Sequence, residues 1–311
     1  DGGYIVCGTS FDGDDSDIML WKVTYDITQS DSGAHELIWG ENLHNGTCVG
    51  ADTNADNTLD DPQPRTESLC ADPAEDGTGD AGTWTPEDAG GTDNGTPDKG
   101  YYAQQTNDGG YIIVGSSYSS TTAYDIRLIK LNSDYSIAFN NTYEVGSGFN
   151  DEEGIYVQQT RDNGFVVVGN YGGSGEGNVF ILKTDYLGTD ATKTIQTYGS
   201  GTFPDAVAAV RQTMDGGFIM VGNKYSQAST MDDVWVIKFT HDLSPEWNYT
   251  YGKDLGDFGT SISQTSDGGY IITGYSYSYP DARDKQSQII LLKLTGDGLL
   301  EDPTNESTTN N

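Results

Sequence analysis

The sequence predicts an all-β protein, a β-propeller of repeated four-stranded antiparallel blades. Three observations predict it. An Asp-Gly-Gly-Tyr type phrase recurs along the chain, an apolar run follows each copy, and the 311 residues include 41 glycines and 20 tyrosines. Glycine and tyrosine favour tight turns and short strands, and a repeat that needs neighbours to cover its faces is typical of propeller blades.

The repeated phrase occurs five times, and its copies begin at Asp1, Asp108, Asp162, Asp215 and Asp267. The last four starts are 54, 53 and 52 residues apart, whereas the first gap is 107 residues long and contains one repeat. The excess in the first gap predicts an insertion at residues 45–98.

Each repeat divides into four short strands. The first ends in Gln-Thr, and Asp-Gly-Gly then supplies the positive φ that a tight hairpin demands. The second and third strands are almost continuously apolar, so we expect both of their faces to be buried. The fourth carries aromatic residues. The third strand ends in a lysine that keeps one register in all copies: Lys22, Lys130, Lys183, Lys238 and Lys293.

Counting strands gives about five blades with one strand short, because the chain begins on a turn and Leu299-Leu300 is a weak fourth strand. The propeller should occupy residues 1–301, interrupted by the insertion at 45–98. Residues 302–311 read as a polar tail or linker, since they offer little apolar surface. Either five blades close as a ring or these blades belong to a larger one.

At these residues the chain resembles the DGGY/DGGF-type propeller repeats of secreted and surface proteins of bacteria and archaea. The resemblance implies the fold, and it leaves function open because propellers host many activities. The Thr-x-Asp-x-Gly pattern, as at Thr106–Gly110, also resembles the Asp-box hairpin of sialidase-type propellers without its closing aromatic. In sialidases that box is a fold element.

The insertion is rich in carboxylates. Asp52, Asn54 and Asp56 provide oxygen ligands at alternate positions, as hard cations such as Ca²⁺ require. Asp60 and Asp61 are available to close that loop. A second acidic stretch contains Asp76 and Asp80. The pairing of these loops near cysteines resembles the calcium loops of thrombospondin type 3 repeats, which implies a calcium site. An acidic loop without a fixed ion is the alternative.

Two of the three cysteines bracket the first acidic loop, and we predict a disulfide between Cys48 and Cys70. Cys7 aligns with apolar strand positions and should be a small core residue. A disulfide, acidic loops and a Thr/Asn-rich tail fit an extracellular or cell-surface protein.

The net charge of −33 makes nucleic acid and anionic membranes poor partners. No apolar run reaches the 18 residues that a membrane span needs.

Three sets of polar residues are candidates for chemistry. The repeated lysines could grip an acidic ligand, but their presence in every repeat favours pairing with an acid of a neighbouring blade. Histidines 35, 44 and 241 fall in no metal-binding pattern, and His241 is expected in a turn. Carboxylates precede the first strands at one mouth of the predicted channel, where a glycosidase would need a pair: Asp151, Glu152, Glu153, Asp205 and Asp257.

The function that this sequence favours is a non-enzymatic extracellular module. It would act as a scaffold, adhesin or structural subunit that calcium would stabilise, and it would meet proteins, glycans or copies of itself. Exposed tyrosines such as Tyr275 and Tyr277 would supply contact area. The alternative is a secreted glycoside hydrolase or lyase that uses the channel-mouth carboxylates.

Overall fold

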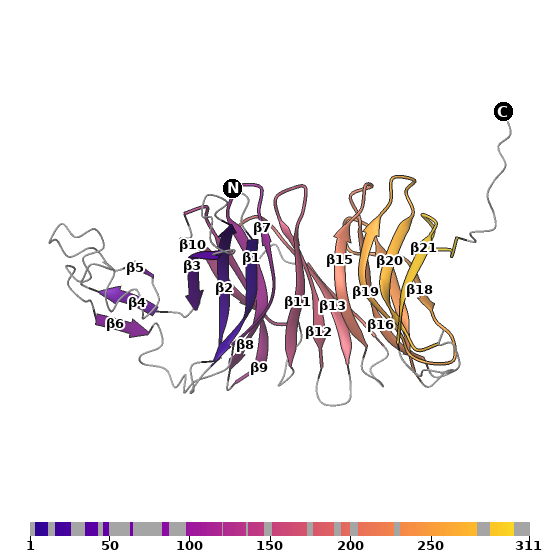
Figure 1. Ribbon diagram of the computed structural model, residues 1–311, viewed down its shortest axis with the longest axis horizontal. Helices are drawn as coiled ribbons and strands as arrows, with labels where there is room; N and C mark the ends of the chain where they lie inside the picture. The colour runs from indigo at the N-terminus through magenta and orange to yellow at the C-terminus, as the bar shows by residue number, and fades with distance from the viewer. Residues whose placement is uncertain are drawn as a thin grey trace. The chain divides into compact units, whose positions relative to one another are not determined.

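The structure is a computed structural model. It describes residues 4–11, 16–25, 35–42, 46–49, 63–64, 83–86, 98–119, 121–134, 136–145, 151–172, 177–189, 194–199, 205–226, 231–278 and 287–301. The chain divides into two compact units, Asp1–Tyr143 and Glu144–Asn311. Strands are the regular secondary structure of these ranges (Figure 1). Within them no helix has the length and hydropathy of a membrane span.

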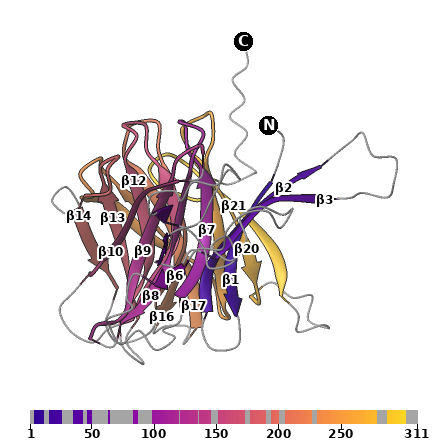
Figure 2. The ribbon, with the colours of Figure 1, turned by 90° about the vertical axis from the view of Figure 1, so that its left-hand side faces the viewer.

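The first unit contains three antiparallel sheets. Strands β1 (Tyr4–Phe11), β2 (Ser16–Tyr25) and β3 (His35–Asn42) form one of them. The next sheet has four strands in meander order, and β8, β9 and β10 lie side by side (Figure 2). Its strands are β7 (Asp98–Gln105), β8 (Tyr111–Ser119), β9 (Ala123–Leu131) and β10 (Ile137–Tyr143).

The third sheet of this unit lies within the predicted insertion. It joins β4 (Gly46–Val49) to β5 (Gln63–Pro64) and β6 (Thr83–Pro86). Asp98, which the prediction counts with the insertion, begins β7.

The second unit repeats the four-stranded sheet twice and adds a sheet of three strands. Within this unit, the first strands of the second and third sheets contact the second strands of the sheets before them. The first sheet contains β11 (Glu152–Gln159), β12 (Phe165–Tyr171), β13 (Asn178–Thr184) and β14 (Thr194–Tyr198). The second contains β15 (Ala206–Gln212), β16 (Phe218–Ser226), β17 (Met231–Phe239) and β18 (Pro245–Tyr251), and the third β19 (Asp257–Gln264), β20 (Tyr270–Ser276) and β21 (Gln288–Leu294).

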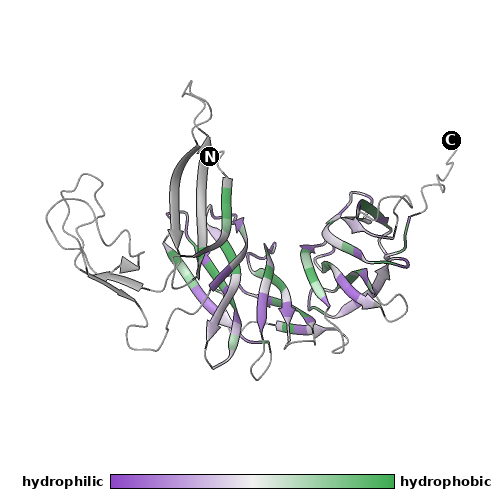
Figure 3. Ribbon diagram, turned by 60° about the horizontal axis from the view of Figure 1, so that its bottom comes forward, coloured by the Kyte–Doolittle hydropathy of each residue, from purple (hydrophilic) through white to green (hydrophobic). Residues whose placement is uncertain are grey.

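The predicted fold class is therefore confirmed: the chain is all-β, with repeated four-stranded antiparallel sheets of the β-propeller type. The second and third strands carry the core, as their sequences predict. Residues 111–116 of β8 and 233–239 of β17 are buried without interruption. Figure 3 shows apolar stretches within the strands of the described sheets. Such continuous burial is typical of strands that are covered on both faces.

The Asp-Gly-Gly turns have the predicted backbone. Gly109, Gly216 and Gly268 have φ of 83°, 87° and 86°. In the turn between β11 and β12 the equivalent residue is Asn163, with φ of 65°. The second glycine of each turn is required for a different reason. A Cβ on Gly217 would lie 2.2 Å from the Phe239 carbonyl oxygen, so the backbone of the third strand excludes a side chain there.

Asparagine and glutamine side chains join successive sheets of the second unit. Asn170 accepts a hydrogen bond from the Val207 amide at 3.0 Å, and Asn223 accepts one from the Gly259 amide at 2.9 Å. The glutamine of the Gln-Thr pair does the same at the turns, where Gln264 accepts from the Met214 amide at 2.7 Å. These polar residues of the repeat are therefore structural.

The last sheet is more exposed than the others. Ile289 and Leu291 on β21 are 90% and 63% exposed, whereas Val234 and Val236, at the equivalent positions of β17, are fully buried. Among the described residues the predicted fourth strand is a single bridge between Leu294 and Leu300.

Candidate functional site

The four repeated lysines whose side chains the structure describes are each paired with the turn aspartate of their own sheet. The Nζ to Oδ2 distance is 2.9 Å for Lys130 and Asp108. The other pairs are Lys183–Asp162 at 3.2 Å, Lys238–Asp215 at 2.9 Å and Lys293–Asp267 at 2.8 Å.

The structure corrects the sequence prediction on this point, since the acid belongs to the same sheet and not to a neighbour. The cause is the antiparallel register. Lys238 pairs with Ile219, close to the start of β16, so the end of the third strand lies beside the turn that opens the second.

The turn aspartate also holds the turn together. Asp108 accepts hydrogen bonds from the Thr106 hydroxyl at 2.5 Å and from the Gly110 amide at 3.0 Å. Partial burial raises the pKa of Asp108, but the bonds from Thr106, Lys130 and Gly110 outweigh it and bring the pKa down to about 2. Asp215 has a pKa lowered to about 2 by the same balance. These carboxylates stay ionised at any ordinary pH, where each holds its lysine.

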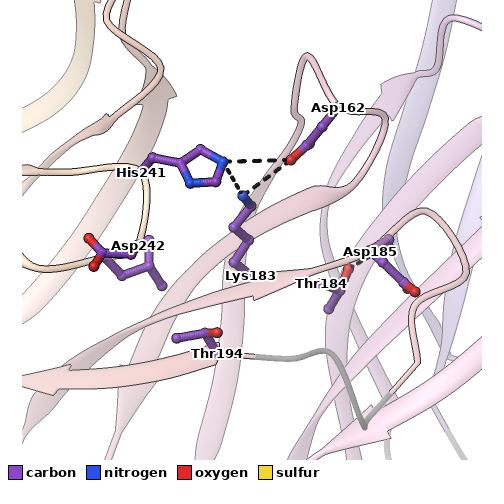
Figure 4. Close-up of a pocket in the computed structure, with 8 residues that line it drawn as sticks. Asp162, Lys183, Thr184, Asp185, Thr194, His241 and Asp242 are labelled. Atoms are coloured by element: carbon purple, nitrogen blue, oxygen red, sulfur yellow. Dashed lines mark hydrogen bonds and ion pairs between the residues drawn. The ribbon is translucent and has the colours of Figure 1, made fainter.

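One of these lysines opens onto a pocket. The pocket lies between the β11–β14 and β15–β18 sheets, and its volume is about 320 Å³ (Figure 4). Lys183 Nζ lies 2.9 Å from His241 Nε2, and Asp162 Oδ2 lies 3.9 Å from the same nitrogen. The lining residues are Asp162, Lys183, Thr184, Asp185, Thr194, His241, Asp242 and Leu243.

The turns on both sides fix the acids of this pocket. Asp185 accepts hydrogen bonds from the Leu187 amide at 3.0 Å and from the Thr189 amide at 3.1 Å. Asp242 accepts a hydrogen bond from the Thr240 hydroxyl. This bond and a second one from the Ser244 amide lower the pKa of Asp242. Because an ammonium group only donates, His241 accepts from Lys183 as a neutral imidazole. The site thus offers fixed acceptors and a cation, a set that suits hydroxyl groups.

The carboxylates that precede the first strands are buried and bound to backbone amides. Glu152 accepts from the Val145 amide at 2.8 Å, and Asp205 accepts from the Tyr225 amide at 3.2 Å. Asp257, 1% exposed, accepts from the Lys253 amide and the Ser278 hydroxyl, each at 2.8 Å. Asp151, in contrast, is exposed, and Glu153 is half-buried.

Asp98 occupies the same position in the first unit as these acids do in the second. It forms a buried ion pair with Arg127 of β9. The sequence predicted that such acids stand at the entries to first strands, and the structure places them there. It did not predict that they are buried, because burial depends on the neighbouring sheet.

The sequence also missed the pocket. His241 was expected as a turn residue, which it is, but its contact with Lys183 joins residues 58 positions apart in the chain. The available signal was the aromatic position of the fourth strand, which is threonine in this repeat alone among the first four.

The predicted metal and disulfide residues lie outside the described residues. These are Asp52, Asn54, Asp56, Asp60, Asp61, Asp76, Asp80 and Cys70, together with the side chain of Cys48. Across the ranges that the structure describes, no three His, Cys, Asp or Glu side chains gather as metal ligands. Cys7 is a free, half-buried cysteine, and burial raises the pKa of its thiol to about 12.

No family model and no curated protein matches this sequence. Solved structures with similarity include a protein of unknown function from Bacteroides caccae, at 11% identity and a TM-score of 0.41, over 96% of this chain and 92% of that one. A thermostable family-43 glycoside hydrolase has 10% identity and a TM-score of 0.41, over 96% and 93%.

An endo-arabinase from Bacteroides thetaiotaomicron VPI-5482 has 10% identity and a TM-score of 0.36, over 68% of this chain and 82% of that one. At such identities the likeness concerns the fold alone, and these TM-scores carry no argument about activity. The chain is a protein of repeated β-propeller sheets, and no family is assigned to it.

Proposed function

We propose that this protein is a non-enzymatic binding module at an extracellular or cell surface, acting as an adhesin or scaffold. Its partners would be glycans, proteins or copies of itself. The proposal treats the repeated sheets as a rigid frame and assigns recognition to positions where one sheet departs from the others.

The burial of three of the five candidate catalytic carboxylates is the observation that carries this proposal. Glu152, Asp205 and Asp257 are each at most 3% exposed. Each accepts a hydrogen bond from a backbone amide of the same unit. A glycosidase needs two carboxyl groups that flank a bound sugar, so acids committed to the fold favour a structural role.

Calcium belongs to the proposal as a stabiliser of the insertion. Isothermal titration of the protein with Ca²⁺ would be compared with an Asp52→Ala/Asp56→Ala variant. Loss of the binding heat in the variant is expected, since these residues would supply two ligands. Equal heats in both proteins would contradict a calcium site at this loop.

A glycan array run beside a hydrolysis screen on polysaccharides tests the proposal. We expect binding signals without release of product. Turnover that a single acid substitution removes would contradict the proposal and establish the enzyme alternative.

A further inference from the structure

The register of the sheets identifies one position where the β11–β14 sheet departs from its counterparts. The repeated lysine pairs across the ladder with an aromatic residue of the fourth strand in three repeats. These pairs are Lys22 with Trp39, Lys130 with Phe139 and Lys238 with Trp247. In β13–β14 the partner of Lys183 is Thr194, which is exposed.

The aromatic ring has a defined place where it is present. Trp247 packs against Tyr270 of the next sheet with ring centroids 5.9 Å apart. It also lies against Gly298, where an added Cβ would meet the indole at 3.0 Å. The tryptophan therefore closes the space beside its lysine at that junction.

The junction between the β11–β14 and β15–β18 sheets, which contains Thr194, has equivalent residues of different size. The Tyr198 hydroxyl donates to the Leu243 carbonyl at 3.1 Å, as the Tyr251 hydroxyl donates to the Gly298 carbonyl at 2.6 Å. Leu243 therefore stands where the next junction has glycine. Its side chain lies at the position equivalent to that where an added Cβ on Gly298 would meet Trp247, and Leu243 and Thr194 both line the pocket of about 320 Å³.

Leu243 has a strained backbone. Its φ is 65°, although leucine is branched and glycine occupies the equivalent position with φ of 84°. Bulky residues with positive φ are outliers, and such strain concentrates at binding sites. The leucine side chain is 1% exposed, so it supports the lining of the pocket from within the junction.

The lysine of this junction is also more accessible than its counterpart. The side chain of Lys183 is 16% exposed, whereas that of Lys238 is 3% exposed and bound to a second acid, Glu246, at 2.6 Å. Lys183 meets His241 of the neighbouring sheet instead. Its ammonium group thus borders the pocket (Figure 4).

From these differences we infer that the pocket binds a single neutral sugar residue of a glycan, an inference that rests on the proposed binding function. The volume falls at the lower end of ligand pockets, which span roughly 300–1,000 Å³. Asp162, Asp242 and Lys183 offer acceptors and a donor for hydroxyl groups.

Charge decides between neutral and acidic sugars. Among the described residues that line the pocket, Asp162, Asp185 and Asp242 outnumber the ammonium group of Lys183, from which the His241 ring nitrogen accepts. A carboxylate on the ligand would meet an excess of negative charge. A uronic acid is therefore disfavoured, and a neutral pyranose or furanose is the ligand that this lining fits.

Saturation-transfer NMR followed by isothermal titration tests the inference on the full chain. The probes are galactose, mannose, N-acetylglucosamine and xylose, each as mono- and trisaccharide, with glucuronic acid as the charged comparator. We expect a neutral saccharide to bind the unmodified protein. Thr194→Trp should raise the Kd of that saccharide at least tenfold, because the indole ring would occupy part of the pocket.

Two further variants keep the result interpretable. Thr197→Trp makes the same change at a residue of β14 that does not line the pocket, and it should leave the Kd unchanged. His241→Ala removes an exposed side chain without touching the core, and it should raise the Kd at least threefold. Thermal unfolding of each variant confirms that it is folded.

The outcomes separate this inference from the proposed function. Equal Kd values for the unmodified protein, Thr194→Trp and His241→Ala would overturn the pocket assignment while binding itself stands. No affinity for any neutral saccharide, or a preference for glucuronic acid, would also overturn it. Release of product from a saccharide would instead contradict the proposed function.

Discussion

Lys238 shows how the repeat uses its charged residues. The ammonium group is almost fully buried, yet it contacts Asp215 and Glu246 and donates to the Phe239 carbonyl at 3.0 Å. A buried ammonium is tolerated only when its charge and its hydrogens are satisfied. The lysine therefore fastens the first turn of the sheet to its third and fourth strands.

A double-mutant cycle measures this attachment. Combining Lys238→Met with Asp215→Asn should give a coupling free energy of unfolding of about 0.5–1 kcal/mol, since the aspartate is largely exposed and screened. Urea unfolding of the four proteins gives the value. The same cycle on Lys130 and Asp108 is the matched control, and a coupling near zero at both sites would contradict the structural role.

At the scale of the element, the sheets depend on close contact between the first strand of one and the second strand of the one before. Gly259 of β19 shows this. An added Cβ would lie 2.6 Å from Val221 and 2.9 Å from Val234, and its amide donates to Asn223. A side chain there would separate two packed sheets.

Gly259→Ala should therefore lower the free energy of unfolding by about 1–3 kcal/mol, the usual cost of overpacking a core. Ser261→Ala, on the same strand, is the control and should change it by less than about 0.5 kcal/mol. Chemical denaturation provides both values. Equal changes in the free energy of unfolding for the two substitutions would contradict the close packing of these sheets at Gly259.

The sequence predicted the strands of each sheet well because their signals are local. Turn glycines, apolar runs and the Gln-Thr ending all lie within one repeat, so β15 to β18 could be expected from residues 205–251. The partner of a side chain in the next sheet is not local. For this reason the burial of Asp257 and the contact of Lys183 with His241 could not be predicted.

Across the whole molecule, a net charge of −33 coexists with turn carboxylates of low pKa. Hydrogen bonds from their lysines and threonines lower the pKa of Asp108, Asp162, Asp215 and Asp267. A carboxyl group whose pKa is lower when folded contributes stability above its unfolded pKa. That contribution is lost as the pH falls through the folded value.

Stability should therefore decline between about pH 4 and about pH 2, as these groups take up protons. Asp108→Asn and Asp215→Asn, which remove two of the low-pKa groups, should flatten this decline. Circular dichroism during acid titration monitors it. An unchanged pH profile in the double variant would show that other carboxyl groups govern acid unfolding.

The central claim is that the repeated buried acids hold the fold and do not catalyse. Asp257 tests it most directly, because this residue is 1% exposed and its carboxylate accepts from the Lys253 amide and the Ser278 hydroxyl. Asp257→Ala removes the acceptor of the Lys253 amide, whereas the Ser278 hydroxyl keeps the Leu255 carbonyl at 2.9 Å. The free energy of unfolding from urea denaturation should fall by about 1.5–3 kcal/mol, the usual contribution of a hydrogen bond to a charged group. An unchanged or higher stability would contradict the claim.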